Sequence, residues 1–442
     1  MLMQFFETLG ALVEQRWRRE NYDENAFPAV ASEALEQMAP SEHLDPWDVI
    51  RWVHNSNTLP PQQDLPASFG NPPITLYDGP RFHIDIYFWL DGTTSIHQHG
   101  FCGAFQVALG SSLHSRYTFG EEREINAHFS VGKTVLENVE LLKQGDTRRI
   151  LPGREFIHSL FHLERPSATI TIRTYSTPGG PQYKYLKPHF AIDPFFGEAS
   201  AIRKVQTVSL LLGMDHPEAD SLIGDLVSSS DFQTTFSVLQ TAAHHLKDRG
   251  LESMFHLDTR RRRFNDLLDR ARTAHGDLVD LIAPVLEEEN RQNNLTSRRA
   301  QITGEDHRFF LALLLNVQSR THVLELVKHR VPDRDPVDTI TDWVEELSSI
   351  RVLGSSEPNV LGIDNVDEDY LFVLASMLEG SAVSQMSIPA PEGDSLDPGS
   401  ETRFAELSES IRKSMLFKSL FLDWPAISGR AKGVAPATSA LT

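Results

Sequence analysis

Hydrophobic residues follow three different patterns along this chain of 442 residues. Near the N-terminus, apolar side chains recur at three- and four-residue spacing, as at Phe5, Leu9, Leu12 and Val13, which predicts amphipathic helices. A stretch rich in Pro, Gly and Gln, LPPQQDLPASFGNPP, then interrupts the pattern. The sequence therefore predicts a helical N-terminal segment over residues 1–60.

Short strand-like segments dominate residues 70–198. Runs rich in β-branched and aromatic residues are bounded by Gly, Asp, Asn or Pro, and include RFHIDIYFWL, GAFQVALG, SSLHSRYTF, TVLENVELL and ATITIRTYS. Several short strands at close spacing are typical of a sandwich or a barrel. The region lacks the strand–helix alternation and the G-x-G-x-x-G loop of a dinucleotide-binding domain, which disfavours that class.

The helical period returns at residue 199 and continues to about residue 425. Segments such as HRFFLALLLNVQSRTHVLELVKHR and DYLFVLASMLEG carry apolar residues at helical spacing, which predicts a large all-α domain. Residues 426–442 are mostly small or polar, and we expect a disordered tail there. The predicted fold class is a multidomain α+β protein, with N-terminal helices, a β-barrel and a C-terminal helical domain.

Charge and composition exclude several functions. The chain has 41 Lys and Arg against 61 Asp and Glu, a net charge of −20, so we expect neither a nucleic-acid nor a membrane partner. The longest apolar run, Phe309 to Leu315, is far shorter than the ~20 residues that cross a bilayer. The N-terminal charge order is the reverse of a secretory signal, and the single Cys102 excludes an internal disulfide. We expect a cytoplasmic location.

The candidate chemistry lies in two histidine clusters. His97 and His99 are two residues apart after an apolar strand, and a strand places both side chains on one face. Two converging neutral imidazoles favour a divalent transition metal, although H-x-H pairs also arise by chance among 18 histidines. The second cluster, His158 and His162, follows a Pro-Gly turn and precedes the next strand.

These clusters resemble the two motifs of the cupin superfamily. The first motif is matched, with one residue fewer before the H-x-H pair, by Gly92, His97, His99 and Gly110. The second is matched, with shifts of one residue, by Gly145, Pro152, Gly153 and His158. The resemblance implies a double-stranded β-helix barrel with His97, His99 and His158 as metal ligands. The usual Glu position of the family falls on Gly103, and its usual Asn is His162.

A three-histidine set without the Glu most resembles cysteine dioxygenase and related thiol dioxygenases. RFHIDIYFWLDGTTSIHQH is similar to that family's ligand strand, and Tyr175 follows His158 by 17 positions, the family's spacing to its catalytic tyrosine. The resemblance covers roughly Ile74 to Pro188. It implies Fe(II), with Ni or Zn as misloaded metals, together with dioxygen and a small-molecule substrate.

Three departures from that family bear on the site. Arg173 stands where the family has a histidine, and Cys102 lies three rather than five residues after His99. No arginine lies between Arg51 and Arg81, where the family would hold a substrate carboxylate. From the resemblance and these departures we predict Tyr175 and Arg173 as catalytic residues. Four further residues are expected to surround the metal ligands or to line the cavity: His162, His83, Cys102 and Arg81.

Two functions remain open on the sequence alone. The first is a non-haem iron oxygenase of the thiol-dioxygenase type, acting on a metal-chelating small molecule other than free cysteine. The second is a non-catalytic scaffold derived from a cupin, which senses a ligand in the barrel and binds a protein partner through the helical domain. Cys102 is expected to be a small buried hydrophobic residue in either case.

Overall fold

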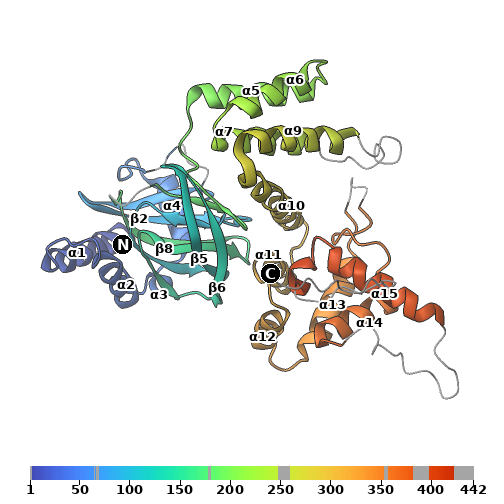
Figure 1. Cartoon of the computed structure of the whole chain (residues 1–442). Coiled ribbons are helices and arrows are strands. Elements are labelled where there is room, and N and C mark those ends of the chain that lie inside the picture. Colours follow the sequence, from blue (N-terminus) through green and yellow to red (C-terminus); the bar gives the residue numbers. More distant parts are fainter. Residues whose placement is uncertain are drawn as a thin grey trace, which may run out of the picture. The chain divides into compact units, whose positions relative to one another are not determined.

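The fold is taken from a computed structural model that describes residues 2–63, 65, 69–177, 181–246, 259–352, 357–381 and 398–422 (Figure 1). The predicted tail over residues 426–442 lies outside the described residues. The chain forms two compact units, Met1–Asn293 and Asn294–Thr442.

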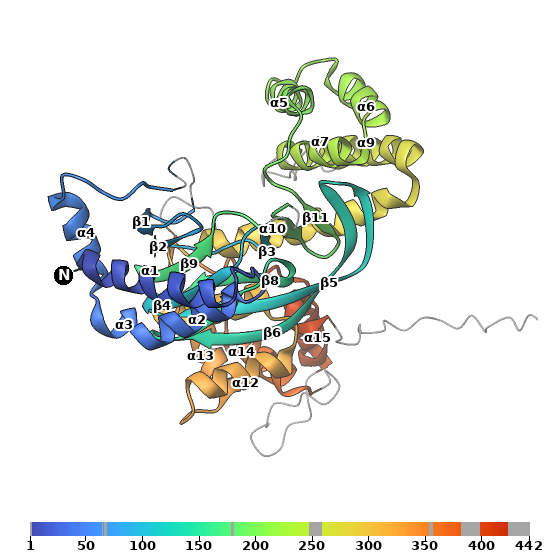
Figure 2. The ribbon, with the colours of Figure 1, turned by 90° about the vertical axis from the view of Figure 1, so that its left-hand side faces the viewer.

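The N-terminal segment is helical, as predicted. Its helices are α1 (Leu2–Arg19), α2 (Phe27–Met38), α3 (Pro40–His43) and α4 (Pro46–Asn55). The helical spacing of apolar residues turns Phe6, Leu9 and Val13 of α1 inward, where they are fully buried. Figure 2 looks onto α1 and α2, which lie against one side of the barrel.

The following region is built of antiparallel strands. They are β1 (Pro73–Asp78), β2 (Phe82–Trp89), β3 (His97–His99), β4 (Gly103–Leu109), β5 (Ser112–Asn126), β6 (Phe129–Leu142), β7 (Thr147–Ile150), β8 (Gly153–His162), β9 (Ser167–Thr174), β10 (Lys184–Leu186) and β11 (Phe190–Ile192). One sheet has the order β1-β2-β9-β4-β7, and the other strands close in the order β10-β11-β6-β5-β8-β3.

The strand order defines the type of barrel. Strands β2 to β9 divide between the two sheets as β2-β9-β4-β7 and β3-β8-β5-β6, so that successive strands mostly alternate between sheets. This is the order of an eight-stranded jelly roll, the architecture of the cupins. The predicted double-stranded β-helix is confirmed, and strands β1, β10 and β11 extend it.

The two faces of the first sheet carry different side chains. Strand β2 is buried along its whole length, because one face meets the N-terminal helices and the other lines the barrel lumen. The outward set packs with α1 and α2 and comprises Phe82, Ile84, Ile86 and Phe88. The alternate residues Tyr87 and Trp89 line a cavity in the lumen.

The predicted C-terminal helical region is present, and its first helix begins at Ala199; the helices up to Asn293 belong to the same compact unit as the barrel. Those of the first unit are α5 (Ala199–Gly213), α6 (Ala219–Ser229), α7 (Phe232–His245), α9 (Thr259–His275), the 3-10 helix η1 (Gly276–Leu281) and most of α10 (Ile282–Arg298). Phe232 and Phe236 of α7 pack edge-on against Phe190 of β11, so a shared apolar core joins these helices to the barrel.

The second unit is helical throughout its described part. Its helices are α11 (Glu305–Asn316), α12 (Arg320–Arg330), α13 (Pro336–Ser348), α14 (Glu368–Glu379), α15 (Pro398–Lys413) and the 3-10 helix η3 (Lys418–Phe421). Phe310 of α11 packs near Trp343 and Phe417, with ring centroids 5.7 and 6.5 Å away. Across the described residues, none of the helices combines the length and apolarity that a bilayer crossing requires.

Candidate metal centre

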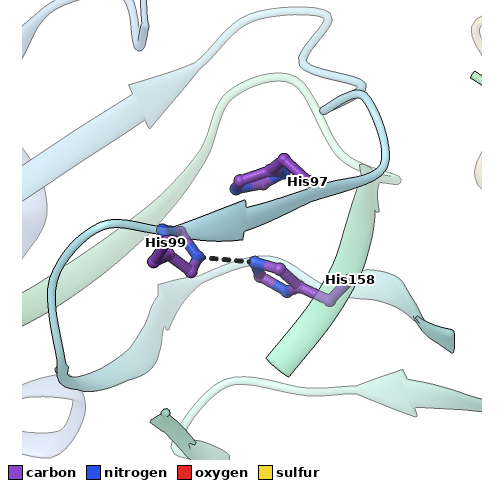
Figure 3. A group of neighbouring side chains, drawn as sticks. All are labelled: His97, His99 and His158. Atoms are coloured by element: carbon purple, nitrogen blue, oxygen red, sulfur yellow. Dashed lines mark hydrogen bonds between the residues drawn. The ribbon is translucent and has the colours of Figure 1, made fainter. Parts of the chain in front are cut away.

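The structure brings His97, His99 and His158 together inside the barrel (Figure 3). His97 and His99 come from β3, where the two-residue period of a strand turns both rings to one side. His158 lies on β8, directly opposite His97 in the strand pairing. One ring nitrogen from each histidine falls within 4.8 Å of the others, and all three residues are buried.

The ring orientations fit a metal ion. Nδ1 of His97 lies 2.8 Å from the Ser95 carbonyl oxygen, which can only accept, so Nδ1 carries the hydrogen and Nε2 keeps a free lone pair. That Nε2 is buried without a hydrogen-bond partner. Nε2 of His99 faces Nε2 of His158 at 2.8 Å. With metal–nitrogen bonds of about 2.1 Å, two ligands at right angles would stand about 3.0 Å apart, close to this spacing.

Burial keeps the three rings neutral. It lowers the pKa of His97, and it lowers the pKa values of His99 and His158 well below the ordinary value of 6.5. The neighbouring histidines act in the same direction on His99 and His158, and the positive charge of Arg173 also lowers the pKa of His99. Neutral imidazole is the form that binds metals.

This arrangement predicts acid sensitivity of the metal-free protein. The unfolded chain binds protons on these histidines below pH 6.5 while the folded chain does not, so stability is full above pH 6.5 and falls as the pH drops. The loss at pH 5.5 should be about 1 kcal/mol for each of His99 and His158, with a smaller contribution from His97, about 3 kcal/mol in all. Urea unfolding at pH 7.5 and 5.5 measures it, and His158→Gln should reduce the loss by a third to a half. Equal stability at both pH values would contradict the assignment of neutral rings.

The position of the usual cupin glutamate cannot hold a side chain here. Gly103 pairs with Arg173 of β9, and a Cβ atom on Gly103 would overlap the carbonyl oxygen of Ile172 and lie 2.9 Å from Cα of Arg173. The close approach of the two backbones requires glycine. The ligand set predicted from the sequence, three histidines without a carboxylate from this position, therefore agrees with the packing.

The histidines line a small cavity of about 50 Å³, enclosed mainly by aromatic, aliphatic and threonine residues. Its other lining residues are Phe69, Tyr87, Trp89, Thr94, Phe101, Phe105, Ile150, Leu160, Thr169 and Thr171. A larger, more open hollow of about 620 Å³ shares Phe69, Trp89 and Thr94 with this cavity and extends to Asp91 and Arg165. The histidines thus lie beside a space of ligand size.

Arg173 is placed close to the histidines. Its side chain is buried, with Nε 3.5 Å from Oδ2 of Asp85, and its guanidinium carbon lies 4.5 Å from the centre of the Phe101 ring. The Phe101 ring in turn lies 4.5 Å from the ring of His99. Arg173 is not among the residues that line the histidine cavity, but it contacts Phe101, which is, and its positive charge acts on His99.

Tyr175 is placed elsewhere. Its side chain is 40% exposed, and its hydroxyl donates to Oδ1 of Asp78 at 2.5 Å and lies 2.7 Å from the carbonyl oxygen of Gly79. Burial and Asp78 raise its pKa. The predicted catalytic role needs the hydroxyl near the three histidines, and alternation along β9 would turn Tyr175 inward with Thr171 and Arg173, but β9 ends at Thr174. The structure thus directs the hydroxyl to Asp78 instead of to the three histidines.

His162 and His83 have partners of their own. Nδ1 of His162 lies 2.8 Å from the Ser112 hydroxyl, and its ring stacks on Trp89. Nε2 of His83 lies 3.0 Å from Oδ2 of Asp85, and the residue is buried. His83 is not among the residues that line the histidine cavity, although it was expected to be.

Cys102 and Arg81 lie outside the lumen. Cys102 is fully buried in the core shared with the N-terminal helices, where Sγ contacts the Glu24 carbonyl at 3.5 Å and the Thr174 hydroxyl at 3.7 Å. Burial raises the pKa of its thiol. Arg81 is exposed and its guanidinium stacks over the ring of Tyr22, so the structure does not bring it to the histidine cavity.

A second group of residues, not predicted from the sequence, lies beside His158. Nε2 of His114 lies 3.1 Å from Nδ1 of His158, and Nδ1 of His114 lies 2.9 Å from Oε1 of Glu140. Arg148 donates two hydrogen bonds to the same carboxylate, at 2.9 and 2.6 Å. The ring that contacts Nδ1 of His158 is therefore His114, whereas Nδ1 of His162, which was expected near the metal ligands, contacts Ser112.

Comparisons with known proteins add the following. No protein-family model matches the chain, and no curated protein matches it. Among solved structures, a DMSP lyase matches at 14% identity over 26% of this chain and 51% of that chain, with a TM-score of 0.19. A protein of Klebsiella pneumoniae with a double-stranded β-helix domain matches at 14% identity over 30% of this chain and 90% of that chain, with a TM-score of 0.18. The capsular polysaccharide assembling protein CapF of Staphylococcus aureus matches at 14% identity over 26% of this chain and 32% of that chain, with a TM-score of 0.17.

The chain therefore spans about half the length of the DMSP lyase and a third of that of CapF. The class of protein is defined by the chain's own strand order and by its buried histidines. It is a double-stranded β-helix protein with a three-histidine group suited to a metal ion.

Proposed function

We propose that this protein is a metal-dependent oxygenase of the thiol-dioxygenase type that uses Fe(II). The observation that carries the proposal is the group of three buried, neutral histidines whose ligand atoms lie within 4.8 Å of one another. A ferrous ion held by three histidines keeps coordination positions open for a chelating substrate and dioxygen. Nickel and zinc suit the same nitrogen ligands and would be the expected misloaded metals.

The chain's own residues would bind and orient the substrate. Arg173 supplies a fixed positive charge near His99, so it would hold an anionic group of the substrate through its planar donors. Thr169 and Thr171 line the cavity, where the Thr169 hydroxyl accepts a hydrogen bond from Nε1 of Trp89, and the aromatic walls would restrict water there. Tyr175 has no part in this proposal, because its hydroxyl is directed to Asp78.

The space around the site supports a substrate larger than free cysteine. A cavity of about 50 Å³ has room for the reacting end of a molecule only. The adjoining hollow of about 620 Å³ is large enough for the remainder, with Arg165 and Asp91 at its wall. The substrate class we propose is an anionic, metal-chelating small molecule with a bulky second part.

Oxygen uptake by the iron-loaded protein tests the proposal. Free cysteine at millimolar concentration should give slow uptake without saturation, whereas a panel of larger thiols and enolates should include a compound that saturates. Cysteine turnover near 1 per second with saturation below about 1 mM would refute the substrate class. Uptake with no member of the panel, in a protein that holds iron, would favour the ligand-sensing scaffold over the oxygenase.

A further inference from the structure

A chain of hydrogen-bonded side chains leads away from His158, on the side opposite to the metal-facing nitrogen. It consists of His114 on β5, Glu140 on β6 and Arg148 on β7. We propose that His114 and Glu140 are positioning residues of the metal centre, which fix Nε2 of His158 as its ligand atom and strengthen that atom as a donor. This inference rests on the metal centre of the proposed function.

The hydrogen positions follow from the carboxylate end of the chain. Glu140 is held ionised because Arg148 and His114 lower its pKa to about 2. A carboxylate only accepts, so Nδ1 of His114 carries the hydrogen that it donates to Glu140. On a neutral ring, Nε2 of His114 is then an acceptor, and it accepts from Nδ1 of His158. The lone pair of His158 is left on Nε2, the atom that faces His99.

The sheet itself builds this alignment. Strands β6, β5, β8 and β3 are neighbours in that order, and Glu140, His114, His158 and the pair His97–His99 occupy them one after another. His114 lies directly opposite Glu140 in the pairing of β5 with β6. In the pairing of β5 with β8, His114 lies opposite Leu160, two residues along the strand from His158, so the row of side chains runs obliquely at this step. Strands hold every member of the row, and this gives the ring of His158 a defined rotation.

The chemistry of such a row is known from simpler metal sites. A histidine ligand commonly donates its second ring nitrogen to a carboxylate, which fixes the tautomer and raises the basicity of the ligand nitrogen. Here an imidazole, His114, stands between ligand and carboxylate. His114 is buried, whereas the side chains of Glu140 and Arg148 are 28% and 35% exposed, so the outer residues can be replaced without opening the core.

The experiment measures Co(II) and Zn(II) affinity of the full-length protein by chelator competition. Removing the acceptor in His114→Phe, or the carboxylate in Glu140→Ala, should weaken binding by about 10- to 100-fold. Glu140→Gln keeps an oxygen that accepts from His114, so it should recover part of the affinity lost in Glu140→Ala. The Co(II) absorption spectrum should shift in His114→Phe, because the donor strength of His158 changes.

Two matched variants serve as controls, Glu137→Ala on the exposed side of β6 and His128→Phe, whose ring bonds Asp193. Both should bind metal as the unaltered protein does. Unaltered affinity and an unaltered Co(II) spectrum in His114→Phe and Glu140→Ala would overturn the positioning role while leaving the metal centre in place. If His114→Phe does not fold, the metal affinity of Glu140→Ala alone decides whether the positioning role is correct. Failure of the unaltered protein to bind either metal would instead overturn the metal centre, and the positioning role with it.

Discussion

Replacing His97 and His99 together by alanine should abolish metal binding. The purified protein is expected to hold about one metal ion per chain, and the double variant less than a tenth of that, because a single remaining imidazole cannot retain a transition metal against buffer and chelators. Both residues lie in a three-residue strand at the lumen, so the fold should persist. Metal analysis of the purified proteins, alongside circular dichroism, measures the effect.

His128→Ala is the matched control for the double variant. His128 is a histidine of the same barrel, bonded to Asp193, and is not one of the three clustered residues. Its replacement should leave the metal content unchanged. Full metal content in His97→Ala/His99→Ala would show that the three-histidine group is not the metal centre.

Gly103→Ala should destabilise the barrel by about 3 kcal/mol or more. The added methyl group would overlap the carbonyl oxygen of Ile172, and both backbones are held there by the pairing of β4 with β9. Backbone atoms in two paired strands cannot move aside as a flexible side chain does. The overlap can therefore be relieved only by displacing the strands, which costs free energy. Chemical denaturation of the metal-free protein measures the change in the free energy of unfolding.

Gly120→Ala provides the comparison, because a Cβ on Gly120 meets nothing within 4 Å. That variant should change the unfolding free energy by less than about 1 kcal/mol. Equal stability of the two variants would show that β4 and β9 are further apart at Gly103 than the structure has them. Metal content of Gly103→Ala, if it folds, tells whether the strain spreads to His99.

Much of the fold was predictable from the sequence. The short strand-like runs between residues 70 and 198 predicted the barrel strands, and the helical spacing at both ends predicted the flanking helices. Both predictions were possible because the spacing of apolar residues differs between a strand and a helix. The close match of Gly92, His97 and His99 to a known motif identified the type of barrel. The division of the chain at Asn293 has no local signal, because it depends on which helices share a core.

The candidate site was predictable only where local spacing determines it. The two-residue spacing of His97 and His99 ensured a common face, whereas the position of Tyr175 depended on where β9 ends. His114 was missed because its role comes from strand register. Strands β5 and β6 form a hairpin in which Asn126 pairs with Phe129. A regular hairpin counted back from this pair would place His114 opposite Leu141, but the bulges between them shift the partner of His114 to Glu140.

The first sheet carries different residues on its two sides at β2 and β9. Phe82, Ile84, Ile86 and Phe88 of β2 pack outward in the core shared with α1 and α2, while the inward positions on β9 are Thr169, Thr171 and Arg173. Exchanging Thr169 or Thr171 therefore alters the wall of the histidine cavity and leaves the hydrophobic core on the outer side of the sheet unchanged. The two positions differ in what a substitution would cost. Because Thr169 accepts a hydrogen bond from the buried Nε1 of Trp89 at 3.1 Å, Thr171 is the position at which the cavity wall can be changed with the smaller loss of stability.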